Sequence, residues 1–163
     1  MRRVGSCAVV AACILARVPA VSAQGRAEVA VSYDFLYHEY EETSAAGMHV
    51  GAAVPIAHFK GVVEAGVNRF DGATVSSFMG GARWRLGRGS SAKLEPSVQA
   101  LIGAWRCCEE TNVAFQPGLL LDYRYSSKVA IRGGLALRHI FVSDFDDENA
   151  FRLSAGVVWS LSR

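Results

Sequence analysis

The chain has 163 residues, with 17 Lys and Arg against 15 Asp and Glu, and 51% of its residues are hydrophobic. This length fits one domain and disfavours a two-domain enzyme. After the first 23 residues, 14 basic groups face 15 acidic ones, a balance that disfavours a nucleic-acid-binding domain. The apolar content is too high for disorder, and no apolar run reaches the length of about 18 residues typical of a transmembrane helix.

Residues 1–23 have the pattern of a secretory signal peptide. A cationic start is followed by an apolar stretch and by a small-residue cleavage site that ends at Ala23. Cleavage there predicts a mature domain over residues 24–163. The small residues before Cys13 also resemble a lipoprotein cleavage site, so a lipid-anchored N-terminus at Cys13 stays an alternative.

From Ala27 onward, apolar and polar residues alternate with period two in eight successive segments, which is the pattern of strands with two different faces. Segments of roughly nine to twelve residues match the length that a tilted strand needs to cross a bilayer. The connecting stretches alternate between short turns and mostly longer, acidic loops, as in outer-membrane barrels. We therefore predict an all-β fold: an eight-stranded antiparallel up-and-down transmembrane β-barrel with short periplasmic turns and longer acidic extracellular loops.

The polar residues of this alternating pattern, which would share one face of each strand and are called the polar parity, combine small residues with charges of both signs. Such a mixture fits the narrow lumen of an eight-stranded barrel, which side chains just fill. Guanidinium groups are suited to bridging carboxylates away from bulk water. We therefore predict a plugged lumen, negligible conductance and a lumen charge network made of Glu28, Asp34, Glu64, Glu95, Asp122, Arg83, Arg124, Arg132, Arg138 and Arg152.

The apolar parity is aliphatic in the middle of the strands and aromatic at both ends. Two aromatic girdles around an aliphatic band indicate a lipid-facing surface. The aromatic residues at the two ends are Phe35, Tyr37, Phe78, Phe115 and Phe151 toward the loops, and Trp84, Tyr123, Tyr125 and Trp159 toward the turns. A soluble periplasmic barrel that binds an apolar ligand would turn this set inward, and it remains an alternative.

The last segment ends in a polar residue, a glycine, an aromatic residue and a final hydrophobic residue: Ser154, Gly156, Trp159 and Leu161. This pattern is similar to the C-terminal assembly signal of outer-membrane barrels, although an aromatic residue is usual where Leu161 stands. With it, the chain resembles the small OmpA/OmpX-type outer-membrane β-barrel superfamily over residues 26–161. The resemblance implies an outer-membrane location, contact with membrane lipid and assembly by the barrel-insertion machinery. It also implies a structural or surface-interaction role, with a possible partner at the loops.

Two prolines stand inside predicted strands. Proline has no backbone N–H, and a closed barrel has no free edge strand where Pro96 or Pro117 could stand without losing a ladder hydrogen bond. We expect bulges or irregular ladder bonds at these two positions.

The acidic loops suggest weak cation binding. Hard divalent cations prefer oxygen ligands, and the densest run of carboxylates lacks the glycine and the distant bidentate Glu of a dedicated calcium loop. We expect no resident cofactor, and only loose Ca²⁺ or Mg²⁺ binding at the weak candidates Asp144, Asp146, Asp147 and Glu148.

Cys107 and Cys108 are adjacent in an expected loop. An exported protein meets an oxidising environment, which would favour a vicinal disulfide, but the ring closed by neighbouring cysteines is strained. A functionless pair is the plainer interpretation.

Catalysis has one candidate location. His139 lies on the lipid-facing parity, and Ser143 and Glu148 are close in sequence, as a lipid A-modifying barrel enzyme would require. The short His-x-Ser-Asn pattern of the lipid A deacylase barrels is absent, since Ile140 and Phe141 follow His139. No residue is nominated as catalytic, and a lipid A deacylase-like hydrolase is kept as the alternative function.

Overall fold

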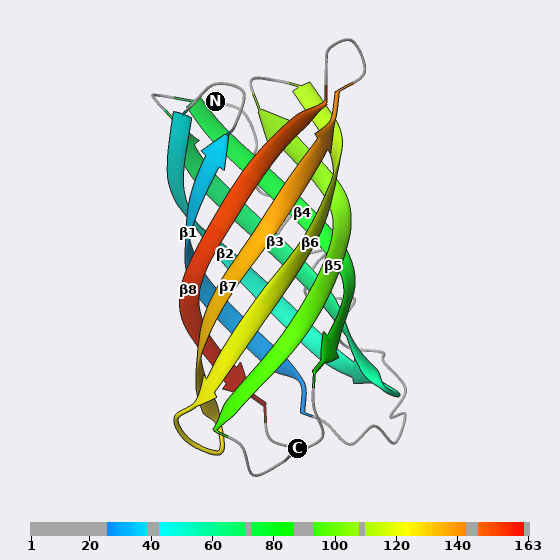
Figure 1. Cartoon of the computed structure of the whole chain (residues 1–163), viewed down its shortest axis with the longest axis vertical. Coiled ribbons are helices and arrows are strands. Elements are labelled where there is room, and N and C mark those ends of the chain that lie inside the picture. The colour runs from blue at the N-terminus through cyan, green and yellow to red at the C-terminus, as the bar shows by residue number, and fades with distance from the viewer. Residues whose placement is uncertain are drawn as a thin grey trace, which may run out of the picture.

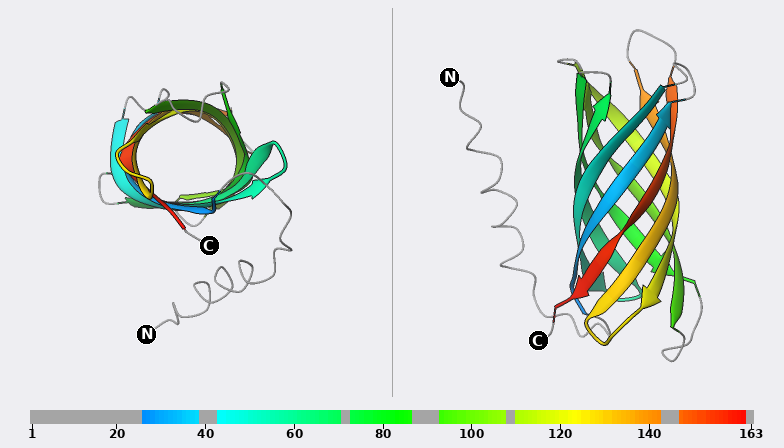
Figure 2. Two further views of the ribbon diagram at one scale, coloured as in Figure 1. Left: turned by 90° about the horizontal axis from the view of Figure 1, so that it is seen from below. Right: turned by 90° about the vertical axis from the view of Figure 1, so that its left-hand side faces the viewer.

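The computed structural model describes residues 26–38, 43–70, 73–86, 93–107, 110–142 and 147–161. Within these ranges, eight antiparallel strands close into a barrel (Figures 1 and 2). The strands are β1 (Glu28–His38), β2 (Thr43–Ile56), β3 (Phe59–Phe70), β4 (Ala73–Arg85), β5 (Leu94–Cys107), β6 (Glu110–Arg124), β7 (Val129–Phe141) and β8 (Glu148–Ser160). Among the described residues, no helix is long and apolar enough to cross a membrane.

Each strand pairs with its neighbours in sequence, and β8 pairs with β1 to close the barrel. At this seam Val31 lies opposite Val157 and Tyr33 opposite Ala155. β1 starts and β8 finishes at the end that carries the β2–β3 and β6–β7 turns, which we call the turn end (Figure 2). The opposite end is called the loop end. The predicted fold class is confirmed.

The apolar parity faces outward, as predicted. Ile102, Leu119 and Leu153 are each more than half exposed although they lie within strands. Exposed aromatic side chains follow toward the ends, among them Phe78 at 57% and Trp84 at 42%. A continuous apolar surface of this kind needs a nonaqueous environment. The soluble-barrel alternative requires these residues inside, and the structure places them outside.

The connections differ from the expected asymmetry. Short turns and long loops were expected at opposite ends, but the longest connection, residues 86–93, lies at the turn end. At the loop end, only two residues separate β3 from β4 (residues 71–72), and only two separate β5 from β6 (residues 108–109). The reason is that the paired strands run on into stretches that were expected to be loops, so their polar residues belong to hairpin ends.

The prolines do not create bulges. The register between β5 and β6 runs without a shift from Leu94–Tyr123 to Cys107–Glu110, through both Pro96 and Pro117. Between β6 and β7, however, the pairing skips Gln116 and Pro117 and then resumes in the same register. The predicted irregularity therefore occurs at Pro117 as missing ladder pairs without a bulge, and the β5–β6 pairing shows neither a bulge nor a gap at Pro96.

The loop half of the lumen is mainly apolar, which the sequence interpretation did not anticipate. Inward-facing side chains from several strands form one buried cluster, most of which lies in this half, while its members Ala53 and Val62 lie beside Glu28 in the turn half. It includes Leu36, Ala45, Val75, Met79, Leu101, Trp105, Ala114, Ile140 and Ala150. Apart from Arg138, the buried charged residues of the described lumen occupy the middle of the barrel and the turn half.

Candidate functional site: the charged lumen

The middle of the lumen holds an inner group made of Asp34, His49, Glu64 and Arg152, which come from four different strands. Arg152 donates from Nε to Asp34 Oδ2 at 3.1 Å and from Nη1 to Glu64 Oε2 at 3.1 Å. His49 lies with Nδ1 2.5 Å from Asp34 Oδ1 and also contacts Arg152. All four side chains are at least nine-tenths buried. Buried charges are tolerated when they are paired in this way, and the pairs join β8 to β1 and β3 across the lumen.

A second cluster, the Glu28 group, lies nearer the turn end and consists of Glu28, Lys60, Arg83, Asp122 and Arg132. Glu28 contacts Lys60 and accepts longer hydrogen bonds from Arg83 at 3.4 Å and Arg132 at 3.5 Å. Arg132 also binds Asp122 through two N–H groups, at 2.6 and 2.7 Å. Such fork-like pairing is the strong form of an Arg–carboxylate contact.

Gln99 connects the two groups. Its Oε1 accepts hydrogen bonds from Arg83 Nε at 2.9 Å and Nη2 at 2.7 Å, while its Nε2 donates to Glu64 at 2.9 Å. The amide is 6% exposed. One neutral side chain therefore satisfies a cation on one side and a carboxylate on the other, which joins the buried charges into one network.

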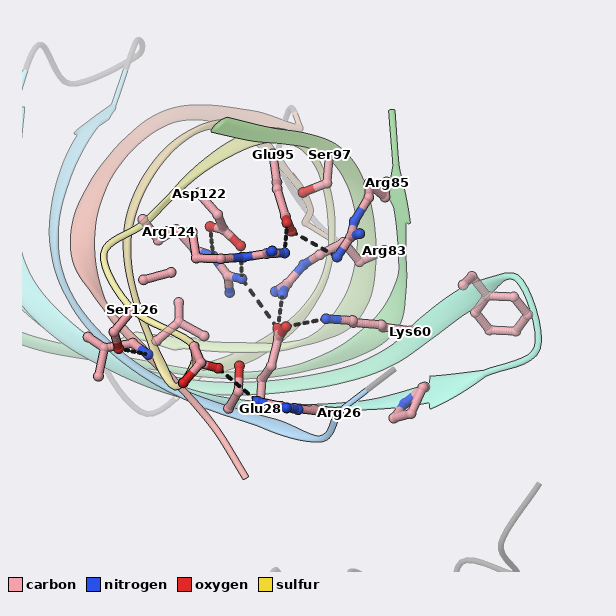
Figure 3. Close-up of a pocket in the computed structure, with 18 of the residues that line it drawn as sticks. Arg26, Glu28, Lys60, Arg83, Arg85, Glu95, Ser97, Asp122, Arg124 and Ser126 are labelled. Carbon is pink, nitrogen blue, oxygen red and sulfur yellow. Dashed lines mark hydrogen bonds and ion pairs between the residues drawn. The ribbon is translucent and has the colours of Figure 1, made fainter. Parts of the chain in front are cut away.

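The turn end of the lumen opens into a cavity of about 500 Å³. Its mouth carries Arg26, Arg85, Glu95 and Arg124, of which Arg85 Nη2 lies 2.8 Å from Glu95 and Arg124 also contacts Glu95. Figure 3 shows Arg85, Glu95 and Arg124 directed into the barrel interior, across it from Glu28, whereas Arg26 lies beside Glu28. The Arg26 guanidinium donates to the Ser127 carbonyl at 2.8 Å in the β6–β7 turn.

Arg138 is set apart from the other lumen charges. It is 2% exposed, donates from Nε to Gln116 Oε1 at 2.8 Å, and places its guanidinium 4.6 Å from the centre of the Trp105 ring. A desolvated cation over an indole face gains stabilisation from the ring quadrupole. Arg138 therefore borders the apolar cluster in the loop half.

His139 lies on the outer surface, near the loop end. Its Nδ1 is 2.9 Å from Asn149 Oδ1, its Nε2 is 3.2 Å from Asp147 Oδ2, and its ring meets Phe141 edge-on with centroids 4.7 Å apart. Ser143, the expected nucleophile of the catalytic alternative, lies outside the described residues. Glu148 is half-buried in β8, and the acid beside His139 is instead Asp147.

Two further predicted sites fall partly outside the described residues. Asp144 and Asp146 lie outside them, and the described part of the chain holds no cluster of three metal-ligating side chains. Asp147 accepts a 3.3 Å hydrogen bond from the Val142 backbone N–H. Cys107 is half-buried against the apolar cluster, but Cys108 is not described. Loose cation binding and the vicinal disulfide therefore stay predictions.

The predicted assembly residues lie in β8 and directly after it. A Cβ on Gly156 would lie 2.3 Å from the Val31 carbonyl oxygen and 2.1 Å from Ser32 Oγ, so only glycine allows β8 to approach β1 this closely. Trp159 faces outward, and the Leu161 backbone N–H donates to the Ala27 carbonyl at 2.8 Å. These residues therefore form the seam that closes the barrel.

The sequence interpretation missed two parts of the site. Lys60 and Gln99 were not among the predicted residues, although both complete the network. Their strand parity was the available signal, because Gln99 shares the inward parity of Ser97 and Glu95. The same parity would have placed Leu36 inside the loop half.

No family model matches the chain, and no curated protein matches it. Solved structures do. The chain is similar to the Neisserial surface protein A, with a TM-score of 0.69 at 13% identity over 83% of this chain and 96% of that one. It is also similar to the outer membrane enzyme PagL, with a TM-score of 0.62 at 13% identity over 78% of this chain and 97% of that one.

A third similar structure is the N-terminal β-barrel domain of Pseudomonas aeruginosa OprF, with a TM-score of 0.55 at 12% identity over 85% of this chain and 100% of that domain. At identities this low, the similarity establishes the fold and not the activity. Together with the outward apolar band, it shows that the chain has the fold of the small eight-stranded outer-membrane β-barrels.

Proposed function

We propose that the protein is an outer-membrane barrel with a plugged lumen, acting in a structural or surface-interaction role and not as a solute channel. The carrying observation is the network of the inner group, Gln99 and the Glu28 group, which spans the barrel from β8 to β5. The apolar cluster behind it adds a second barrier in the loop half. Ions crossing the lumen would have to break buried, mutually satisfied charge pairs.

Planar-bilayer recording tests this proposal. Purified protein is expected to give no steady open state. A variant with Arg83, Gln99 and Arg152 all changed to Ala removes the cross-links but keeps the apolar cluster, so any rise in its conductance above that of the parent measures how much of the seal the network provides. Reproducible channels of defined size from the unaltered protein would contradict the plugged lumen.

The proposed partners follow from the surface. The outward apolar band would contact outer-membrane lipid, and the β8 seam fits a role in recognition by the barrel-insertion machinery. The polar loop end would meet any surface partner. Such a role requires neither a cofactor nor catalysis.

A lipid-modifying enzyme is the second candidate, because His139 faces outward, hydrogen-bonds Asn149 and has its Nε2 3.2 Å from Asp147 Oδ2. An imidazole oriented by a carboxylate is the usual partner of a hydroxyl nucleophile. PagL is an enzyme with this fold. Phe141, however, stands where the His-x-Ser-Asn pattern has its serine.

Mass spectrometry of lipid A separates the two candidates. Cells expressing the protein, its His139→Ala variant and its Ser143→Ala variant are compared with cells lacking it. Identical lipid A in all four would leave the structural role. Loss of an acyl chain that depends on both residues would establish the enzyme.

A further inference from the structure

The cavity at the turn end reaches the buried network, so on the plugged lumen proposed above it is open at this end alone. It enters the lumen between the β2–β3 turn, with Ala57 and His58, and the β6–β7 turn, with Ser126 and Ser127. Its inner wall includes Arg83 and Arg132, which belong to the buried network. A molecule that enters from the turn end therefore meets a closed wall and must leave by the same route.

The charges that line this cavity are unequal. Among the described lining residues, three carboxylates (Glu28, Glu95 and Asp122) face six cations (Arg26, Lys60, Arg83, Arg85, Arg124 and Arg132). Part of this excess is offset deeper in the lumen, where Arg83 Nη2 comes within 3.9 Å of Glu64. Among the described lining residues, the remaining surplus lies at the mouth, which holds Arg26, Arg85 and Arg124 together with Glu95.

A plug made only of cross-linked side chains has no need of this surplus. Arg85 and Arg124 are 46% and 40% exposed, so their guanidinium groups keep a surface toward the cavity while they contact Glu95. Figure 3 shows them on the opposite side of the opening from Arg26. Several cations around a recess with low-dielectric walls concentrate the electrostatic field, which attracts anions into the recess.

We propose that this recess is a binding site for a small soluble oxyanion that carries two or three negative charges on carboxylate or phosphate groups. Guanidinium donors bind both kinds of group through paired N–H contacts. The anion would enter from the turn end and dock against Arg85, Arg124 and Arg26. Because the inner wall is closed, the barrel would act as a receptor for this anion and not as its transporter.

Calorimetric titration tests the proposal on the full barrel refolded in zwitterionic detergent. Sodium pyrophosphate and sodium citrate are titrated separately, and the two arms distinguish a phosphate from a carboxylate ligand. At least one of them should bind with 1:1 stoichiometry at an ionic strength of about 0.15 M, where isolated surface charges are largely screened. Absence of saturable binding by both anions would overturn the proposal.

Charge-matched variants locate the site. Changing Arg85 and Arg124 together to Gln should weaken binding at least about tenfold, because each charge-assisted contact contributes substantially. The matched control changes Arg69 and Arg106, two exposed residues near the loop end, to Gln and alters the net charge equally. Equal weakening by both pairs would show a nonspecific effect of net charge and overturn the site.

A third variant gives an effect of opposite sign. Glu95→Gln removes the carboxylate that competes for Arg85 and Arg124, so it should tighten anion binding severalfold. Heat-modifiable migration on gels confirms that each variant is folded. If the arginine pair fails to fold, Glu95→Gln still decides the matter, since unchanged or weaker binding would contradict an anion site at the mouth.

Discussion

Arg152→Met should strongly destabilise the barrel. The change removes a guanidinium that donates to two buried carboxylates, Asp34 and Glu64, which are 2% and 9% exposed. Breaking a buried ion pair on one side typically costs about 3–5 kcal/mol, since the other charge is left uncompensated. A carboxylate left without its cation could instead take up a proton, which costs about 4 kcal/mol at pH 7. The loss of stability per carboxylate should therefore not exceed about this value.

The assay is urea unfolding of the barrel in lipid vesicles, followed by tryptophan fluorescence. We expect the free energy of unfolding to fall by about 3–5 kcal/mol. Arg69→Met, at an exposed position of β3, should stay within about 0.5 kcal/mol of the parent. Adding Asp34→Asn and Glu64→Gln to Arg152→Met should recover most of the loss. A loss below about 1 kcal/mol, the size expected for an exposed ion pair, would refute the dry, tightly coupled lumen.

Three further outcomes are expected. Leu119→Arg, on the outward face near mid-strand, should cost about 2–4 kcal/mol in vesicle unfolding, whereas Leu94→Arg at the strand end should cost about 0–1 kcal/mol, and equal costs would contradict a membrane-embedded band. Gly156→Val should abolish heat-modifiable folding because the β8–β1 seam has no room for a Cβ, while Gly133→Val, with nothing within 4 Å of its Cβ position, should fold. Replacing Asp144, Asp146, Asp147 and Glu148 by amides should remove weak Ca²⁺ binding of about millimolar affinity, and indistinguishable calorimetric heats would leave the loop as ordinary solvated charge.

The barrel itself could be predicted because parity along a strand is a local property. Val31 and Asp34 differ in polarity, and in any closed barrel they must face opposite sides. The lengths of the connections at the loop end could not be predicted, because polar residues such as Arg106 and Thr111 occur both in loops and at the ends of hairpins. How far the paired strands extend at this end depends on hydrogen bonds between them that composition does not encode.

The network could be predicted in its members but not in its connections. Arg152 and Glu64 are 88 residues apart, and their contact depends on the tilt and register of the closed barrel. The link that Gln99 makes between the two groups could not be predicted, because a neutral amide side chain is equally common on a face exposed to solvent. The cavity depends on the volume that the side chains leave unfilled, which strand parity does not determine.

The division of the lumen into an apolar loop half and a charged, open turn half means that salt acts on its ion pairs unequally. Mobile ions reach the Arg85–Glu95 pair at the mouth, whereas the Arg152–Asp34 pair lies behind the Glu28 group. Rising ionic strength should therefore loosen the barrel from the turn end first, with backbone amide exchange accelerating near Ser97 before it does near Leu101. Two neighbouring stretches of one strand, β5, would then differ in stability although both are paired with the same neighbouring strands.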